Sequence, residues 1–179
     1  MIKSDKTINY YLKNIDVCIE WAIKKPDKIQ CDKLKKEEKK WGNEMIGDYN
    51  NGQWTTKLGE HLVYHILKNK GMNPKKCKKK NGFIPDWETE DYIYEVKTRN
   101  WQVSGTAGEK VLGTFIKYQS IPEYYNKPLK IICIAYQEYE LTQGKINYFG
   151  DNISDKTKEI LDLAKKWNIE YIAFSEFIK

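Results

Sequence analysis

The sequence has few of the residues that would build a disulfide or zinc framework. Its four cysteines form no C-x-x-C pair and are scattered along the chain, at Cys18, Cys31, Cys77 and Cys133. Such spacing is typical of free thiols in a reducing compartment. The chain has only two histidines, His61 and His65. They lie one helical turn apart, but without a further histidine or an H-E-x-x-H order they do not indicate zinc.

Long apolar segments are also missing. No apolar run approaches the roughly 20 residues that span a bilayer, and the opening M-I-K-S-D-K-T has no apolar signal core. We therefore expect a cytoplasmic protein with no membrane partner. With 31% charged and 40% hydrophobic residues, the 179-residue chain has the composition of one globular domain. A chain of this length buries about two-thirds of its unfolded surface.

Arginine is almost absent, because Arg99 is the only one and lysine supplies the rest of the positive charge. The net charge of +6 and the pI near 8.9 permit binding to a polyanion, since neutralising phosphates releases counterions. This positive charge by itself excludes few classes of function. A functional prediction therefore depends on local patterns.

The most informative stretch is F-I-P-D-W-E-T-E-D-Y-I-Y-E-V-K-T-R, residues 83–99. Residues 83–88 and 92–98 are rich in β-branched and aromatic residues, and the acidic segment between them predicts a turn. With Thr89 and Glu90 as the loop, Trp87 lies opposite Tyr92. The sequence thus predicts a β-hairpin.

Alternation along this hairpin places Asp86, Ile93, Glu95 and Lys97 on one face. Asp86 and Glu95 become diagonal cross-strand neighbours, roughly 7 Å apart, a separation that one divalent cation can bridge. Two carboxylates that close repel each other unless a cation lies between them. The alternative is a solvated hairpin face on which Glu95 and Lys97 form a weak ion pair.

Pro85-Asp86 followed by Glu95-Val96-Lys97 resembles the PD-(D/E)XK signature of metal-dependent nucleases. The resemblance implies an α/β fold with a restriction-endonuclease-like core, a mixed β-sheet flanked by helices, to which the N-terminal residue pattern adds a helical extension. It also implies that Asp86, Glu95 and the Val96 carbonyl bind Mg²⁺, with Mn²⁺ able to substitute. Lys97 would then orient and help activate the water that attacks a phosphodiester.

A helix is expected over residues 57–69, with an N-cap at Thr55 and Thr56 and an end at Lys70 and Gly71. Many nucleases of the family carry a glutamate on the helix before the signature strands. Glu60 in this helix is similar to that residue, so the resemblance implies a catalytic role for it as a further metal ligand. The alternative is an ordinary surface glutamate.

The segment G-T-A-G-E-K-V-L-G and the residues after it, together about 105–135, resemble type II restriction endonucleases, and the likeness to the family covers roughly residues 55–137. Small residues let a backbone approach phosphates closely, and basic or amide side chains can contact DNA. The alternative is solvated lysines beside a tight loop. The predicted DNA-binding residues are Lys78, Lys79, Arg99, Lys110, Lys117 and Gln119.

The remaining pattern predicts two N-terminal helices, at residues 7–25 and 28–41, and then a loop to residue 54. A part-helix is expected over 109–118, a buried strand over 129–135 and a hairpin around residues 143–144. An amphipathic helix at 155–167 and a last strand at 170–178 complete the chain. We expect residues 1–50 to form a helical segment for packing, dimerisation or DNA contact, and residues 51–179 to form the nuclease core.

These patterns favour a Mg²⁺-dependent endonuclease acting on double-stranded DNA, most simply a sequence-specific type II restriction enzyme. Such an enzyme implies a cognate DNA methyltransferase as companion. Two alternatives are a structure-specific nuclease, such as a junction resolvase or repair enzyme, and a non-catalytic DNA-binding module of the same fold. A structural protein would require the acidic pair to be accidental. Because a palindromic site suits a two-fold assembly, we also expect a homodimer formed through the N-terminal helices.

Overall fold

The computed structural model describes residues 40, 54–99, 107–144 and 146–179. The two predicted N-terminal helices and the loop after them lie almost wholly outside these residues. The first helix described in full, α4, spans Trp54–Asn69, and the strands β1, β2 and β3 follow at Lys75–Lys76, Trp87–Glu88 and Ile93–Arg99. Three short helices come next, α5 (Ala107–Leu112), α6 (Thr114–Lys117) and α7 (Ile121–Tyr125). The remaining elements are β4 (Leu129–Ala135), α8 (Tyr136–Gln143), α9 (Asp155–Lys166), β5 (Ile169–Ala173) and α10 (Phe174–Phe177).

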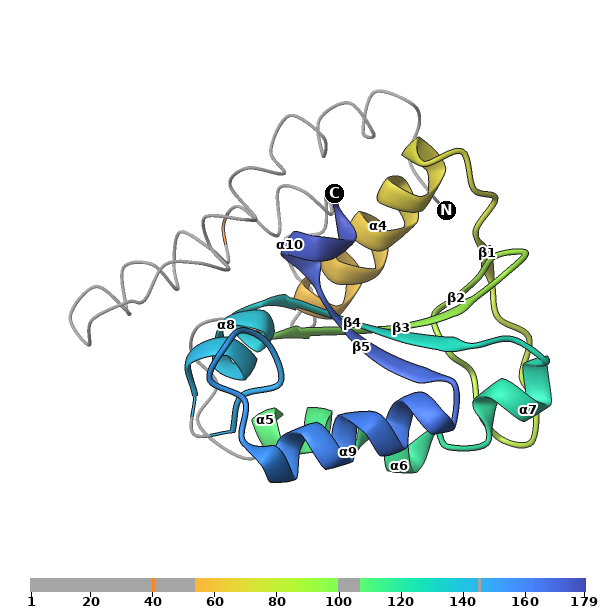
Figure 1. The fold of residues 1–179 in the computed structure, drawn as a ribbon. Helices are drawn as coiled ribbons and strands as arrows, with labels where there is room; N and C mark the ends of the chain where they lie inside the picture. The colour runs from red at the N-terminus through yellow and green to blue at the C-terminus, as the bar shows by residue number, and fades with distance from the viewer. Residues whose placement is uncertain (1–39, 41–53, 100–106, 145) are drawn as a thin grey trace.

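The strands form one five-stranded mixed sheet in the order β1-β2-β3-β4-β5. β1, β2 and β3 pair antiparallel, whereas β3, β4 and β5 pair parallel. Figure 1 shows α4 and α10 on one side of this sheet and α5, α6 and α9 on the other. The predicted α/β class, with a mixed sheet between helices, is confirmed at this level.

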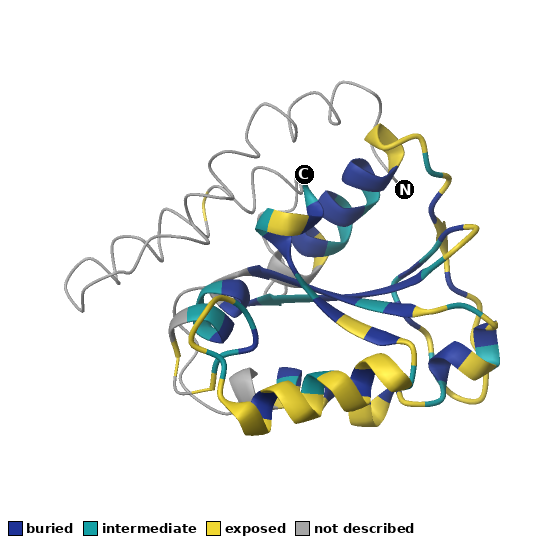
Figure 2. Ribbon diagram, in the orientation of Figure 1, coloured by how far each residue is buried: buried dark blue, intermediate teal, exposed yellow. Residues whose placement is uncertain are grey.

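Each face of the sheet has its own apolar core. One core joins the buried face of α4 to β3, β4 and α10, through residues such as Leu62, Tyr94 and Phe174. The other joins the opposite face of the strands to α6, α7 and α9, through residues such as Ile131 and Tyr118. Figure 2 shows the consequence for α9, whose outer side is exposed while Ala164 is buried. Because β3 contributes to both cores, its even and odd residues face different surroundings.

The α4 helix ends as predicted and begins earlier than predicted. At the end, Gly71 adopts a φ of +76°, and the Met72 N–H donates to the Leu67 carbonyl over 3.0 Å. That left-handed turn suits glycine because it has no Cβ. The predicted N-cap at Thr55 and Thr56 is wrong, since the helix starts at Trp54 and contains both residues.

The predicted hairpin is present with a different register. Trp87 pairs with Tyr94 and Glu88 with Ile93, whereas the prediction paired Trp87 with Tyr92. The turn is displaced along the chain, because the Thr89 N–H donates to the Tyr92 carbonyl over 2.9 Å and the Thr89 hydroxyl accepts from the Tyr92 N–H over 3.2 Å, which leaves Glu90 and Asp91 between the bonded residues. A shift of two residues leaves every side chain on its predicted face.

One prediction for the C-terminal half is wrong, and another is correct only in part. The expected hairpin around residues 143–144 is the helix α8, and the expected strand at 170–178 ends at Ala173, where α10 begins. A long-range contact accounts for α10, because Glu138 of α8 accepts hydrogen bonds from the Ser175 N–H, over 3.1 Å, and the Ser175 hydroxyl. A carboxylate at these first N–H groups stabilises a helix start. The strand predicted over residues 129–135 is confirmed as β4, and the helix at 155–167 as α9.

The part-helix expected over 109–118 is present as α5 and α6, interrupted at Gly113. The basic run at residues 74–81 contains β1. None of the helices in the described ranges combines the length and apolar character that crossing a membrane requires.

Candidate metal centre

Two carboxylates lie side by side where β2 meets β3. Asp86 directly precedes β2, and its N–H donates to the Tyr94 carbonyl over 3.0 Å. Its Oδ2 accepts the Val96 N–H over 2.7 Å. Asp86 is therefore anchored to the residues on both sides of Glu95, which brings the two acids next to each other.

Glu95 is held from two directions. Its Oε1 lies 2.5 Å from the Lys97 Nζ and accepts the Tyr118 hydroxyl over 3.2 Å. Lys97 shares the face of Glu95 because the two are separated by one residue on the same strand. Glu95 is 5% exposed, so its charge is largely removed from water. The structure thus brings Asp86, Glu95 and Lys97 together and adds Tyr118.

The proximity of the two acids changes the protonation of Asp86. Burial, as the larger cause, and the charge of Glu95 together raise the pKa of Asp86 to about 7, although the hydrogen bond from the Val96 N–H opposes the shift. A carboxylate with this pKa is only partly ionised at neutral pH. A cation placed between the acids would offset both the burial and the repulsion.

The donor set fits a hard divalent cation such as Mg²⁺. Besides the two carboxylates, the Val96 carbonyl points to the same side of β3 as the Val96 N–H that meets Asp86, because both groups of a strand residue project the same way. Mg²⁺ is commonly held by one or two carboxylates, with water and phosphate oxygens completing its shell. Among the described residues, no three acidic, histidine or cysteine side chains converge as a ready-made metal cluster.

Glu60 does not join the two acids in this structure. Its carboxylate pairs with the Lys76 ammonium, which lies 4.1 Å from the centre of the Trp87 ring. The Trp87 Nε1–H in turn donates to the Glu60 carbonyl over 2.9 Å. The charge of Glu60 nevertheless contributes to the raised pKa of Asp86, so the two carboxylates are near each other. Because the Lys76 side chain is 55% exposed, this ion pair is worth under about 1 kcal/mol and is easily exchanged.

The predicted DNA-binding residues divide into exposed and buried ones. Lys78 and Lys79 are exposed just after β1, and Lys110 is exposed on α5. Lys117 is exposed on α6, with its Nζ 4.8 Å from the centre of the Tyr118 ring. Gln119 lines a groove of about 650 Å³ between α7 and the end of α9.

Arg99 occupies a different kind of place. It is 9% exposed, and its guanidinium pairs with the Glu140 carboxylate of α8. A buried ion pair of this kind links β3 to α8. The placement favours a structural role for Arg99 over direct contact with a phosphate.

The two histidines lie on α4, the helix that carries Glu60. Burial lowers the pKa of His65 to about 4, with the neighbouring His61 adding to the effect, and burial also lowers the pKa of His61. Both are neutral at pH 7. They are therefore not cationic contacts for a polyanion.

Two residues of this centre, Tyr118 and Lys76, were missed by sequence reasoning. Tyr118 lies 23 positions from Glu95, and Lys76 lies 16 positions from Glu60. The only available signal for Tyr118 was its place in K-Y after the glycine-rich segment. The signal for Lys76 was its place in a basic run, where nothing distinguishes it from its neighbours.

Comparisons with models of protein families, with curated proteins and with solved structures found no match.

Proposed function

We propose that this protein is a Mg²⁺-dependent endonuclease that hydrolyses phosphodiester bonds of double-stranded DNA, with a restriction-endonuclease-like core. The observation that carries the proposal is the meeting of Asp86 and Glu95 at the β2–β3 edge, with the Lys97 ammonium on the Glu95 carboxylate. The order of these residues along two adjacent strands supports the PD-(D/E)XK interpretation.

Asp86, Glu95 and the Val96 carbonyl would hold the ion, and Glu60 could join them by exchanging its exposed partner Lys76. A bound Mg²⁺ supplies neutralising charge for the phosphate and lowers the pKa of a coordinated water. Lys97 donates hydrogen bonds from a position fixed by Glu95, so it can orient the attacking water and stabilise its developing charge. Tyr118 limits the rotation of Glu95 by its hydrogen bond.

A structural explanation accounts for less of this arrangement. Asp86 could serve only to satisfy the Val96 N–H, and Glu95 only to pair with Lys97. That explanation leaves two like charges adjacent in a partly buried place, which destabilises the fold when both are ionised. Sites of ligand binding and catalysis commonly accept such a cost.

The resemblance to type II restriction endonucleases favours sequence-specific cleavage, with a cognate methyltransferase as companion. One observation favours the alternative of a structure-specific nuclease, namely the partly exposed aromatic rings of Phe83 and Tyr124, which adjoin Tyr118 and are bordered by lysines. A non-catalytic DNA-binding module is the further alternative. The sequence-specific nuclease, the structure-specific nuclease and the non-catalytic module all keep the same carboxylate pair. Because the pair does not distinguish them, cleavage assays are needed to separate them.

The direct test is incubation of supercoiled plasmid with the protein and Mg²⁺. We expect nicked or linear product from the wild type and none in EDTA. Asp86→Ala, Glu95→Ala and Lys97→Ala should each reduce cleavage at least about 100-fold, because each removes a group that acts on the reacting centre. Glu88→Ala is the matched control, since Glu88 lies two positions from Asp86 and pairs instead with Lys127 over 2.6 Å. A Lys97→Ala protein that cuts at the wild-type rate would overturn the assignment.

A further inference from the structure

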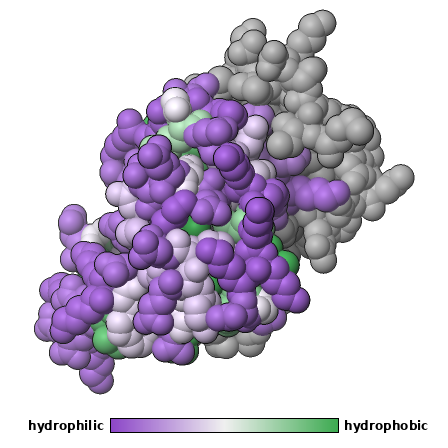
Figure 3. Space-filling model, turned by 90° about the vertical axis from the view of Figure 1, so that its right-hand side faces the viewer, coloured by the Kyte–Doolittle hydropathy of each residue, from purple (hydrophilic) through white to green (hydrophobic). Residues whose placement is uncertain are grey.

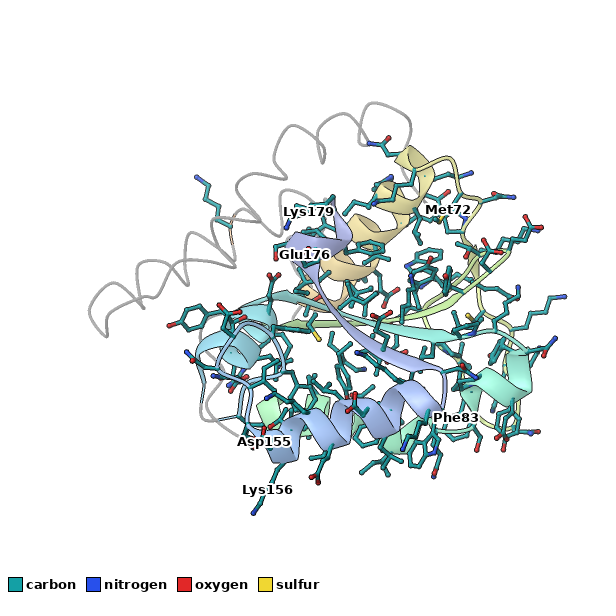
Figure 4. The ribbon with its side chains drawn as sticks, viewed as in Figure 1. Met72, Phe83, Asp155, Lys156, Glu176 and Lys179 are labelled. Atoms are coloured by element: carbon teal, nitrogen blue, oxygen red, sulfur yellow. The ribbon has the colours of Figure 1, made fainter. Side chains whose placement is uncertain are left out.

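A row of aromatic rings leads away from the carboxylate pair. Its first member is Tyr118, whose hydroxyl donates to Glu95. The Tyr118 ring packs edge-on against Phe83, with centroids 5.8 Å apart, and Phe83 stacks on Tyr124 of α7 at 6.3 Å with an interplanar angle of 29°. Phe83 and Tyr124 are partly exposed, in contrast to the buried Tyr118. Figure 4 shows Phe83 between α6 and α7, on the same side of the sheet as α9.

Lysines accompany these rings. At the inner end, the Lys117 Nζ lies 4.8 Å from the centre of the Tyr118 ring. At the outer end, the Lys80 Nζ donates to the Tyr124 carbonyl over 3.0 Å and lies 4.4 Å from the Tyr125 ring centre. These contacts hold the ammonium groups beside the rings while both lysines remain exposed. Positive charge therefore borders the aromatic row at both ends.

A tight turn fixes Phe83 and Lys80 relative to each other. The two residues exchange backbone hydrogen bonds of 2.9 and 3.0 Å across Asn81 and Gly82, which have φ of 47° and 87°. Positive φ at both central positions is the geometry of a two-residue hairpin turn, which Asn-Gly favours. The Tyr125 hydroxyl donates to the Lys78 carbonyl over 2.5 Å and ties the turn to α7. Little conformational entropy is then lost when a ligand contacts Phe83.

The chemistry of this surface fits a particular form of DNA. In a continuous duplex the base faces are stacked inside, so a protein meets only base edges and phosphates. Unpaired nucleotides expose their faces, which stack on aromatic rings while lysines neutralise the adjacent phosphates. Figure 3 views the molecule from the side that carries β1 and α7 and shows a largely hydrophilic surface broken by small hydrophobic areas. Partly exposed rings bordered by lysines therefore match unpaired nucleotides better than an intact helix.

We propose that Phe83 and Tyr124, flanked by Lys80 and Lys117, bind unpaired nucleotides of a DNA substrate and position the adjoining strand at Asp86 and Glu95. This inference rests on the proposed nuclease function and, within it, on the structure-specific alternative, whose substrate class it names as DNA that contains an unpaired segment next to a duplex. The contact of Tyr118 with both Phe83 and Glu95 provides the continuity between the binding surface and the reacting centre.

The test compares two DNAs of equal length and charge, a blunt duplex and a duplex with a short unpaired segment, by fluorescence anisotropy in EDTA so that no strand is cut. A 2-aminopurine in the unpaired segment reports stacking by its quenching. We expect the wild type to bind the DNA with the unpaired segment at least about 10-fold more tightly, in keeping with a stacking contribution of about 1–3 kcal/mol per base. Its 2-aminopurine signal should be quenched.

Phe83→Leu keeps an apolar side chain and removes the ring. It should reduce the preference below about 3-fold, abolish the quenching and leave blunt-duplex binding unchanged; Tyr124→Leu should act in the same direction. Ile84→Ser is the matched control, because Ile84 adjoins Phe83 and is 57% exposed but lies outside the ring row. This control should retain the wild-type preference.

Equal binding of both DNAs by the wild type would overturn the inference. A Phe83→Leu variant that keeps both the preference and the quenching would also overturn the inference. The Ile84→Ser control is expected to keep both. Cleavage of plasmid without any preference for unpaired DNA would refute this surface alone and leave the proposed function standing. Preferential binding without cleavage of any DNA would refute the nuclease and leave the surface standing.

Discussion

At the scale of single residues, the centre is defined by competition for Glu95. Its Oε1 already accepts a hydrogen bond from Tyr118 and an ion pair from Lys97, while Asp86 supplies negative charge from the neighbouring strand. Without a metal the lysine partly offsets the repulsion. A bound cation would take over that task and leave Lys97 available to act on water or phosphate. This exchange gives each residue a distinct expected phenotype.

Asp86→Asn should stabilise the metal-free protein at alkaline pH. The pKa of Asp86 is raised from 3.8 to about 7 in the folded state. Between these values the folded protein keeps a proton that the unfolded chain has lost, so stability falls as pH rises through this window. The shift corresponds to at most about 4 kcal/mol, and we expect a gain of about 2 kcal/mol at pH 8. Denaturant unfolding in EDTA at pH 4, 6 and 8 measures it; an equal effect at all three pH values would contradict the explanation.

Tyr118→Phe should separate the hydroxyl from the ring. The ring packing is kept, but Glu95 loses its hydrogen bond, so we expect cleavage at saturating Mg²⁺ to fall about 10-fold and stability to fall by about 1 kcal/mol. Tyr171→Phe is the matched control, because the Tyr171 hydroxyl is buried and bonds to backbone groups, including the Val111 carbonyl over 2.8 Å. It should lose similar stability without the rate effect. Equal rates for the two variants would remove Tyr118 from the centre.

At the scale of elements, α4 and β3 approach each other closely at Gly59. A Cβ placed on Gly59 would overlap the Thr98 Oγ1 and lie 3.1 Å from the Val96 Cγ1. Gly59 immediately precedes Glu60, and α4 is joined to β2 by the bond from Trp87 to the Glu60 carbonyl. The same close packing therefore sets the distance of Glu60 from the two acids on the strands.

Gly59→Ala should destabilise the protein by about 1–3 kcal/mol, because α4 must move away from the sheet to admit the methyl group. It should also slow cleavage, since the displacement carries Glu60 with it. Thermal unfolding and the plasmid assay measure both effects. Adding Thr98→Ala should recover more than half of the lost stability by removing the nearest atom. A double variant no more stable than Gly59→Ala would show that the clash with Thr98 is not the cause.

The local sequence pattern was sufficient to predict some helices and strands and insufficient to predict others. The apolar spacing of α4 and α9 and the continuous apolar run of β4 predicted those elements, and alternation placed Asp86, Glu95 and Lys97 on one face. The hairpin register depended on hydrogen bonds within its loop, from Thr89 to Tyr92. The α10 helix depended on Glu138, which is 37 positions away. Such contacts are absent from any local window, and for the same reason Tyr118 and Lys76 escaped prediction.

At the scale of the whole molecule, the fold places the carboxylate pair at the junction of the antiparallel and parallel halves of the sheet. β3 pairs with β2 on one side and with β4 on the other. The short strand β2 begins only after Asp86, so β2 does not pair with Val96. The Val96 N–H and carbonyl are therefore available to Asp86 and to a cation. A longer β2 would have paired with these backbone groups.

The predicted homodimer concerns residues outside those the structure describes, since its interface was assigned to the N-terminal segment. Two active centres are needed to cut both strands of a palindromic site in one encounter. We therefore expect light scattering to give twice the monomer mass for the free protein and for its DNA complex. A monomer in both states, with nicked circles accumulating before linear product, would contradict the dimer.

Single-turnover cleavage by Lys97→Met, measured together with Mg²⁺ and DNA binding, tests the central claim most directly. Methionine preserves the length of the side chain and removes the ammonium that occupies Glu95. We predict Mg²⁺ affinity equal to or higher than that of the wild type, unchanged DNA affinity within about 3-fold, and cleavage slower by at least about 100-fold. A wild type that cleaves no DNA with bound Mg²⁺, or a Lys97→Met variant that cleaves at the wild-type rate, would contradict the assignment of Asp86, Glu95 and Lys97 as a hydrolytic metal centre.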